Sequence, residues 1–154
     1  MFKKFFLIII LVLSGACGYE AVNTEKKLLS SNFSINQVIF LGDKEINRNL
    51  KQKINKYTRS KEIKNYDLQI ESQSIKSILG KDTKGNATIF NLELDITIII
   101  KRTNFENIEL QINESFKYNN NSNKFELQSY ERDLKNNLLG IVMQKLVNKL
   151  SNNQ

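Results

Sequence analysis

The sequence contains no histidine, no tryptophan and no proline, and Cys17 is its only cysteine. Without histidine, and with a single thiol, the chain lacks the residues that form a Ser-His-Asp triad, a Cys-His pair or a typical zinc site. A lone cysteine also excludes a disulfide within the chain. Carboxylates alone could support catalysis, but the sequence shows no tight acidic cluster. We therefore expect no catalytic residues, no metal and no enzyme activity.

The first 16 residues have the organisation of a secretory signal. Lys3 and Lys4 precede an apolar stretch, Phe5–Leu13 (FFLIIILVL), and the small residues Ser-Gly-Ala fill positions 14–16. The apolar stretch has 9 residues, whereas a membrane span needs about 20. The pattern predicts that residues 1–16 direct export of the chain and are then removed.

Cys17 follows these small residues directly, and the arrangement resembles a bacterial lipobox. In that class of signal a peptidase cuts before the cysteine, whose sulfur carries diacylglycerol and whose new amino group is acylated. The resemblance implies that Cys17 is the lipidation site and that the chain has no other cofactor. Leucine is usual three residues before the cysteine, where this chain has Ser14. An ordinary signal peptide cleaved beside Cys17 and an uncleaved anchor remain the alternatives.

Removal of the leader leaves 138 residues, which suit one compact domain. The formal charge of +7 falls to about +5 without Lys3 and Lys4, from 21 basic and 16 acidic residues. This surplus favours anionic partners such as lipid phosphates, although abundant Lys, Asn and Ile throughout the chain also fit a compositionally biased genome. An exported protein does not meet nucleic acid, so we expect no nucleic-acid partner.

Hydrophobic periodicity predicts the elements of the domain. Residues 17–31 show no sustained period, and we expect a lipidated tether there. Residues 32–41 alternate as a strand with one mostly apolar face, and Gly42-Asp43 ends it. Asp43 then caps a predicted helix over 44–60. The apolar stripe of this helix consists of Ile46, Leu50, Ile54 and Tyr57.

Three further strands and a long helix follow. The alternation that begins at Tyr66 shifts after Ser74, which predicts a bulge or the fraying end of a strand. Gly85-Asn86 can supply the positive φ of a turn. Strands are then predicted over 90–100 and 108–118, joined at residues 101–104 as an antiparallel hairpin.

The last predicted helix covers 129–150 and has a broad apolar face. Its main stripe consists of Tyr130, Leu134, Leu138, Ile141, Val142, Leu146 and Leu150, widened by Leu139, Met143 and Val147. Gly140 lies inside it, and we expect a close approach of another backbone there because glycine otherwise weakens a helix. The order strand, helix, three strands, helix predicts an α+β two-layer sandwich over 32–151, with about four strands and two helices on one face. The order of the strands in the sheet is left open.

The whole pattern resembles the LptE family of lipopolysaccharide-assembly outer-membrane lipoproteins. The resemblance is carried by Cys17-Gly18-Tyr19, the helix EINRNLKQKINKY, the strand YDLQIES, the long hairpin and the final helix SYERDLKNNLLGIVMQKLVNKL. It implies a lipid-anchored plug on the periplasmic side of the outer membrane. Such a protein occupies and helps assemble the β-barrel LptD, and it assists delivery of lipopolysaccharide to the outer leaflet. Gly18 is compatible with outer-membrane sorting.

Two groups of polar residues are candidates for contacts with partners. A plug needs a polar surface, which the outward strand positions provide, although an ordinary solvated sheet face has the same pattern: Asn91, Glu93, Asp95, Thr97, Asn107, Glu109, Gln111 and Asn113. For lipopolysaccharide phosphates the candidates are Lys101 and Arg102, then Lys81 and Lys84. These turn cations could equally serve solubility.

A second hypothesis is a generic envelope lipoprotein. Such a protein would stabilise another envelope complex or bind a small amphiphile, and it would share the anchor and the sandwich.

Overall fold

A computed structural model describes residues 32–58 and 64–152 of the chain. The predicted leader, Cys17 and the predicted tether lie outside the described residues. The sheet has four strands, β1 (Phe33–Gly42), β2 (Lys64–Lys81), β3 (Ala87–Lys101) and β4 (Ile108–Asn119). The helices are α3 (Lys44–Ile54), the single 3₁₀ turn η1 (Asn55–Tyr57) and α4 (Lys124–Asn152).

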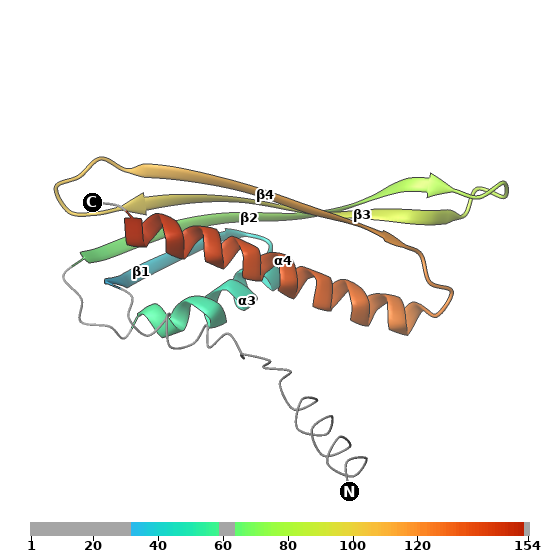
Figure 1. Cartoon of the computed structure of the whole chain (residues 1–154), viewed down its shortest axis with the longest axis horizontal. Helices are drawn as coiled ribbons and strands as arrows, with labels where there is room; N and C mark the ends of the chain where they lie inside the picture. Colours follow the sequence, from blue (N-terminus) through green and yellow to red (C-terminus); the bar gives the residue numbers. More distant parts are fainter. Residues whose placement is uncertain (1–31, 59–63, 153–154) are drawn as a thin grey trace, which may run out of the picture. The chain divides into compact units, whose positions relative to one another are not determined.

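Helices α3 and α4 lie on the same side of the sheet, which gives the domain two layers (Figure 1). The predicted α+β class and the order β-α-β-β-β-α are confirmed. Helix α3 is shorter than predicted, because its α-helical hydrogen bonding ends at Ile54 and the chain then tightens into η1. The strand order is β1-β2-β3-β4, with β1 parallel to β2 and the other neighbours antiparallel.

Strand β2 is longer than the sequence pattern predicted. Its pairing with β1 ends where Gly42 meets Ser72, but its pairing with β3 continues to Lys81. The shift of alternation after Ser74 therefore marks neither a bulge at that point nor a fraying end. The register shifts lie further along, on both sides of Gly80. Strands β2 and β3 thus form an arm that extends beyond β1 (Figure 1).

A β-bulge also changes the apolar face of β1. Asn36 is an extra residue between Ile35 and Gln37, which pair with consecutive residues of β2. Beyond it Val38 and Phe40 pair with buried positions of β2 and face the helices. The predicted alternation over 32–41 assumed an unbroken pleat and so placed these two residues on the wrong face.

The core lies between the sheet and the two helices. Five inward residues of β3 are each at most 2% exposed: Leu92, Leu94, Ile96, Ile98 and Ile100. The predicted stripe of α3 is buried in full, and seven residues of α4 are buried: Leu134, Leu138, Leu139, Val142, Met143, Leu146 and Leu150. Burial of one such side chain contributes about 1.5–3 kcal/mol. Tyr130 and Ile141 were predicted to be buried but are 47% and 40% exposed.

Helix α4 begins five residues before its predicted start, at Lys124. Asn123 caps it, because the side-chain oxygen of Asn123 accepts hydrogen bonds from the backbone N–H groups of Phe125 and Glu126. The Glu126 carboxylate accepts a hydrogen bond from the Asn123 side chain in return. An asparagine with a glutamate three residues later is a capping-box pattern. This first turn was not predicted from periodicity, because it buries no residue.

The passage from β1 to α3 depends on Gly42. Gly42 has φ +87°, and a Cβ atom there would lie 2.0 Å from the carbonyl oxygen of Ser72. The same carbonyl accepts a hydrogen bond of 2.9 Å from the backbone N–H of Asp43. The Asp43 carboxylate then caps α3 by accepting from the N–H groups of Glu45 and Ile46. The close approach at Gly42 therefore sets the position of α3 on β2.

The substitution Gly42→Ala is expected to lower the free energy of unfolding by about 2–4 kcal/mol, through positive φ and a backbone clash. The control is Gly140→Ala. The predicted close approach of another backbone at Gly140 is wrong, because a Cβ there meets nothing within 4 Å. Gly140→Ala should stabilise the domain by up to about 1 kcal/mol. Urea unfolding of both variants measures these changes. Equal stability of Gly42→Ala and the wild type would contradict the role of Gly42.

Candidate functional site

The four candidate phosphate contacts lie at opposite ends of β3. Lys81 pairs with Ala87 at one end of this strand, and Lys101 and Arg102 are at the other end. At about 3.3 Å per residue, the 15 residues of β3 span about 45–50 Å. The structure therefore keeps Lys101 with Arg102 but separates this pair from Lys81 and Lys84. One lipid phosphate group cannot contact both pairs.

The turn between β2 and β3 is held by Asp82. Its carboxylate accepts hydrogen bonds of 2.8 Å from the backbone N–H groups of Lys84 and Asn86, and of 3.0 Å from the Asn86 amide. Hydrogen bonds from the Asn86 side chain and backbone lower the pKa of Asp82 from its usual value. Gly85 has φ +86°, as predicted. The Asp82 carboxylate therefore lies between Lys81 and Lys84 in the sequence of the turn and offsets part of their positive charge.

The turn between β3 and β4 places an aromatic ring against the cation. The guanidinium carbon of Arg102 lies 4.3 Å from the centre of the Phe105 ring, and Phe105 is 57% exposed. Asn104 adopts φ +66°, and the backbone N–H of Phe105 donates a hydrogen bond to the Arg102 carbonyl. The stacked pair gives this turn both positive charge and exposed apolar surface. Phe105 was not among the residues predicted to contact a partner.

The sheet face opposite the helices is mainly polar on β3 and β4, but on β1 and β2 it also exposes Ile39, Leu41 and Ile75. Of the eight residues predicted to point outward, seven lie on strand positions of this face and Asn107 lies in the turn before β4. Asn113 donates a hydrogen bond of 2.7 Å to Glu93, and Gln111 donates one to Glu109. An open groove of about 500 Å³ borders this face at the end of β1, where Glu71 contributes a further carboxylate.

Helix α4 is joined to the arm by a network centred on Glu131. One Glu131 carboxylate oxygen accepts from Lys76 at 2.6 Å and from the Tyr118 hydroxyl at 2.8 Å. Lys76 also lies 4.1 Å from the centre of the Phe90 ring. Burial raises the pKa of Tyr118 well above its usual value, and the hydrogen bond and negative charge of Glu131 add to this effect.

Two more ion pairs join α4 to its neighbours. Lys135 contacts Glu45 of α3 at 2.7 Å, and Lys145 contacts Glu114 of β4. Glu114 and Lys76 both point to the helix side of the sheet, on strands with an open edge. Inward-pointing charges of this kind discourage pairing with a further strand.

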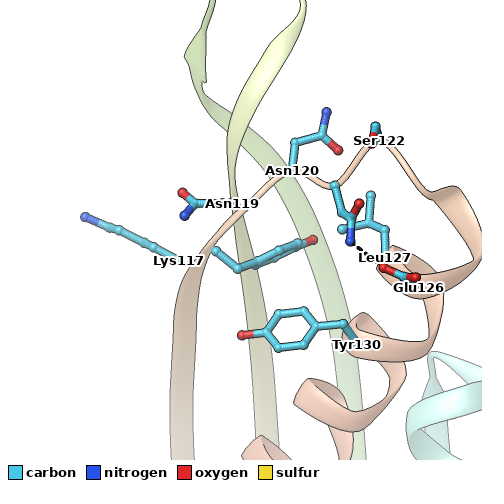
Figure 2. A pocket seen from close by; sticks show the side chains of 9 residues that line it. Lys117, Asn119, Asn120, Ser122, Glu126, Leu127 and Tyr130 are labelled. Carbon is cyan, nitrogen blue, oxygen red and sulfur yellow. Dashed lines mark hydrogen bonds between the residues drawn. The ribbon is translucent and has the colours of Figure 1, made fainter.

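An open groove of about 790 Å³ lies where β4 passes into α4 (Figure 2). Tyr130 extends from α4 beneath the loop, and its ring centre is 5.8 Å from that of Tyr118. Lys117 points away from α4. The amide of Asn121 donates to Glu126, and the amide of Asn120 donates to the Ala87 carbonyl. These polar groups hold the loop against the helix and the arm, so the groove is a structural junction.

Nothing in the described ranges groups three or more potential metal ligands. Of the described helices, none is long and apolar enough to cross a membrane. The arrangement of the described residues is suited to surface contacts through its two charged turns and its polar sheet face.

No family model matches the chain, and no curated protein matches it. Solved structures share its fold. The rare lipoprotein B from Shewanella oneidensis is 14% identical, with a TM-score of 0.50 over 73% of this chain and 98% of that one. A candidate lipoprotein from Caulobacter crescentus is 12% identical, with a TM-score of 0.55 over 81% of this chain and 93% of that one. The architecture is therefore one that such bacterial proteins adopt.

Tyr118 is expected to ionise well above pH 10 in the folded protein and near pH 10 when unfolded. The unfolded chain then releases the proton first, so the stability that Tyr118 contributes is present below pH 10 and is lost as the pH rises further. Ultraviolet titration of phenolate absorbance, compared for the native protein and Tyr118→Phe, measures this. A native titration near pH 10 that Tyr118→Phe removes would show that the hydroxyl is not held by Glu131.

Proposed function

We propose that this chain is an outer-membrane lipoprotein, anchored through lipid on Cys17, that plugs and helps assemble an LptD-like β-barrel. In this role it assists delivery of lipopolysaccharide to the outer leaflet. The protein acts by occupying space and by binding, and it catalyses no reaction.

The observation that carries the proposal is the combination of a lipobox-like sequence before Cys17 with a fold shared with rare lipoprotein B. The likeness spans 98% of that chain, so it covers a whole domain. Neither feature alone is sufficient, because signal peptides precede many folds and the sequence identity is low. Together they favour an envelope lipoprotein with the architecture of this group.

The surface of the domain supports a plug. The lumen of an outer-membrane barrel is polar and wet, and the open sheet face carries carboxylates and amides over three strands. The arm of β2 and β3 lengthens the domain to about 45–50 Å along β3. A bilayer with its headgroups is about 40–45 Å thick. A domain of this length could reach from one side of a barrel to the other.

The separation of the two cationic turns restricts how lipopolysaccharide binds. Lys81 with Lys84 and Lys101 with Arg102 are two independent candidate sites for its phosphates. Arginine and lysine both form charge-assisted hydrogen bonds to phosphate oxygens. A given phosphate group is bound by one of these pairs and not by both.

The test is purification of the tagged protein from its own envelope in mild detergent. The expected result is a stable complex with an outer-membrane β-barrel, identified by mass spectrometry. As a control, the variant Cys17→Ala removes the proposed lipid attachment and should abolish recovery of the barrel, because the protein no longer reaches the membrane. Recovery with a different envelope complex, or as a monomer that carries an amphiphile, would favour the generic lipoprotein instead.

A further inference from the structure

The chain enters the described domain at one particular end of the sheet. Phe33, the first residue of β1, pairs with Lys64, the first residue of β2. Three residues later Asp67 pairs with Lys101 at the end of β3. Helix α4 ends here as well, because the Tyr66 hydroxyl donates to the Leu150 carbonyl at 3.3 Å. We call this the tether end.

Among the residues that the structure describes, the tether end carries more cations than carboxylates. Its basic residues are Lys56, Lys64, Lys101, Arg102 and Lys149, and its acidic residues are Asp67 and Glu106. Lys56 lies over the ring of Tyr57, which stacks on Phe33 with ring centres 5.4 Å apart. These contacts connect one of the cations, Lys56, to the aromatic core of this end.

The turn between β3 and β4 is an exposed part of the tether end. Its Phe105 is 57% exposed, with the Arg102 guanidinium 4.3 Å from the ring centre. Trp and Tyr accumulate at the boundary between lipid headgroups and acyl chains because each has an apolar ring with a polar group. Phe105 with the Arg102 guanidinium against its ring combines the same two properties. Anionic lipid headgroups attract nearby lysine and arginine within about a Debye length, roughly 8 Å.

We propose that the tether end rests on the anionic phospholipid headgroups of the leaflet that holds the acyl chains of Cys17. Lys101 and Arg102 contact the phosphates, and Phe105 enters the headgroup region. This inference rests on the lipid anchor of the proposed function. It orients the arm away from that leaflet and leaves Lys81 and Lys84, at the other end of β3, for contacts at the far side.

A tether alone does not impose this orientation. Residues 18–31 comprise 14 residues, which span up to about 45–50 Å when extended. Either end of the domain could therefore approach the membrane if the domain tumbled freely. A fixed orientation needs the contacts of the tether end, and it predicts a difference between the two ends that tumbling does not produce.

The natural chain has no tryptophan, so one substitution introduces a unique fluorescent probe. We would place it at Phe105→Trp in the tether end and, separately, at Leu79→Trp in the arm, where the native side chain is 52% exposed. Each lipidated full-length mature protein is reconstituted into phosphatidylcholine vesicles with and without phosphatidylglycerol. Phospholipids brominated in the acyl chains serve as the quencher. We expect several-fold stronger quenching at position 105 than at position 79. This difference should appear only in vesicles with phosphatidylglycerol, and high salt should reduce it.

Charge reversal identifies the residues responsible. In the Phe105→Trp protein, Lys101→Glu with Arg102→Glu should remove the quenching. Lys81→Glu with Lys84→Glu, the same change of charge at the arm, should leave it intact. Circular dichroism establishes that each variant is folded. Equal quenching at the two probe positions overturns the proposal. So does quenching at position 105 that is unchanged without phosphatidylglycerol, or unchanged by Lys101→Glu with Arg102→Glu.

Flotation of the vesicles separates this failure from failure of the anchor. If the wild-type protein does not float with pure phosphatidylcholine vesicles, the lipid anchor is absent, and both the proposed function and this inference fail. If the protein floats but the probe at position 105 remains unquenched, only the contact of the tether end is wrong.

Discussion

Five alternating residues of β3, from Leu92 to Ile100, are each at most 2% exposed. Because successive side chains of a strand point to opposite faces, the residues that alternate with these five point away from the helices. Both helices lie on the apolar side of the sheet, where α4 lies over β3 and β4 and Gly42 sets the position of α3. The polar face, the extended arm and the two charged turns are what this one-sided packing leaves available for function.

Much of this architecture could be predicted because its signals are local. The alternation in β3 and the stripe of α3 follow directly from their periods of two and 3.6 residues. The bulge at Asn36 could not be predicted, since the alternation before and after it was consistent with an unbroken strand. The exposure of Tyr130 and Ile141 depends on how far the sheet extends over α4, and helical spacing does not contain that information.

The candidate site also combines residues that could be predicted from the sequence with residues that could not. Its four cations were visible in the sequence, because lysine and arginine in turns are exposed. Their separation follows from the length of β3, which runs between the two turns and keeps Lys81 and Lys101 at opposite ends. The Glu131 network was missed because Lys76 is 55 residues away in sequence. Phe105 was also missed, although an aromatic residue three positions after an arginine in a turn was an available signal.

In the proposed function the domain acts through where it is held and what it touches. The proposed location depends on the chemistry at Cys17, which lies outside the described residues. The most direct measurement is intact mass spectrometry of the protein isolated from its native membrane. The account predicts a chain that begins at Cys17 and carries diacylglycerol and an N-linked acyl chain. A free thiol at this position, or a chain that still has residues 1–16, would contradict it.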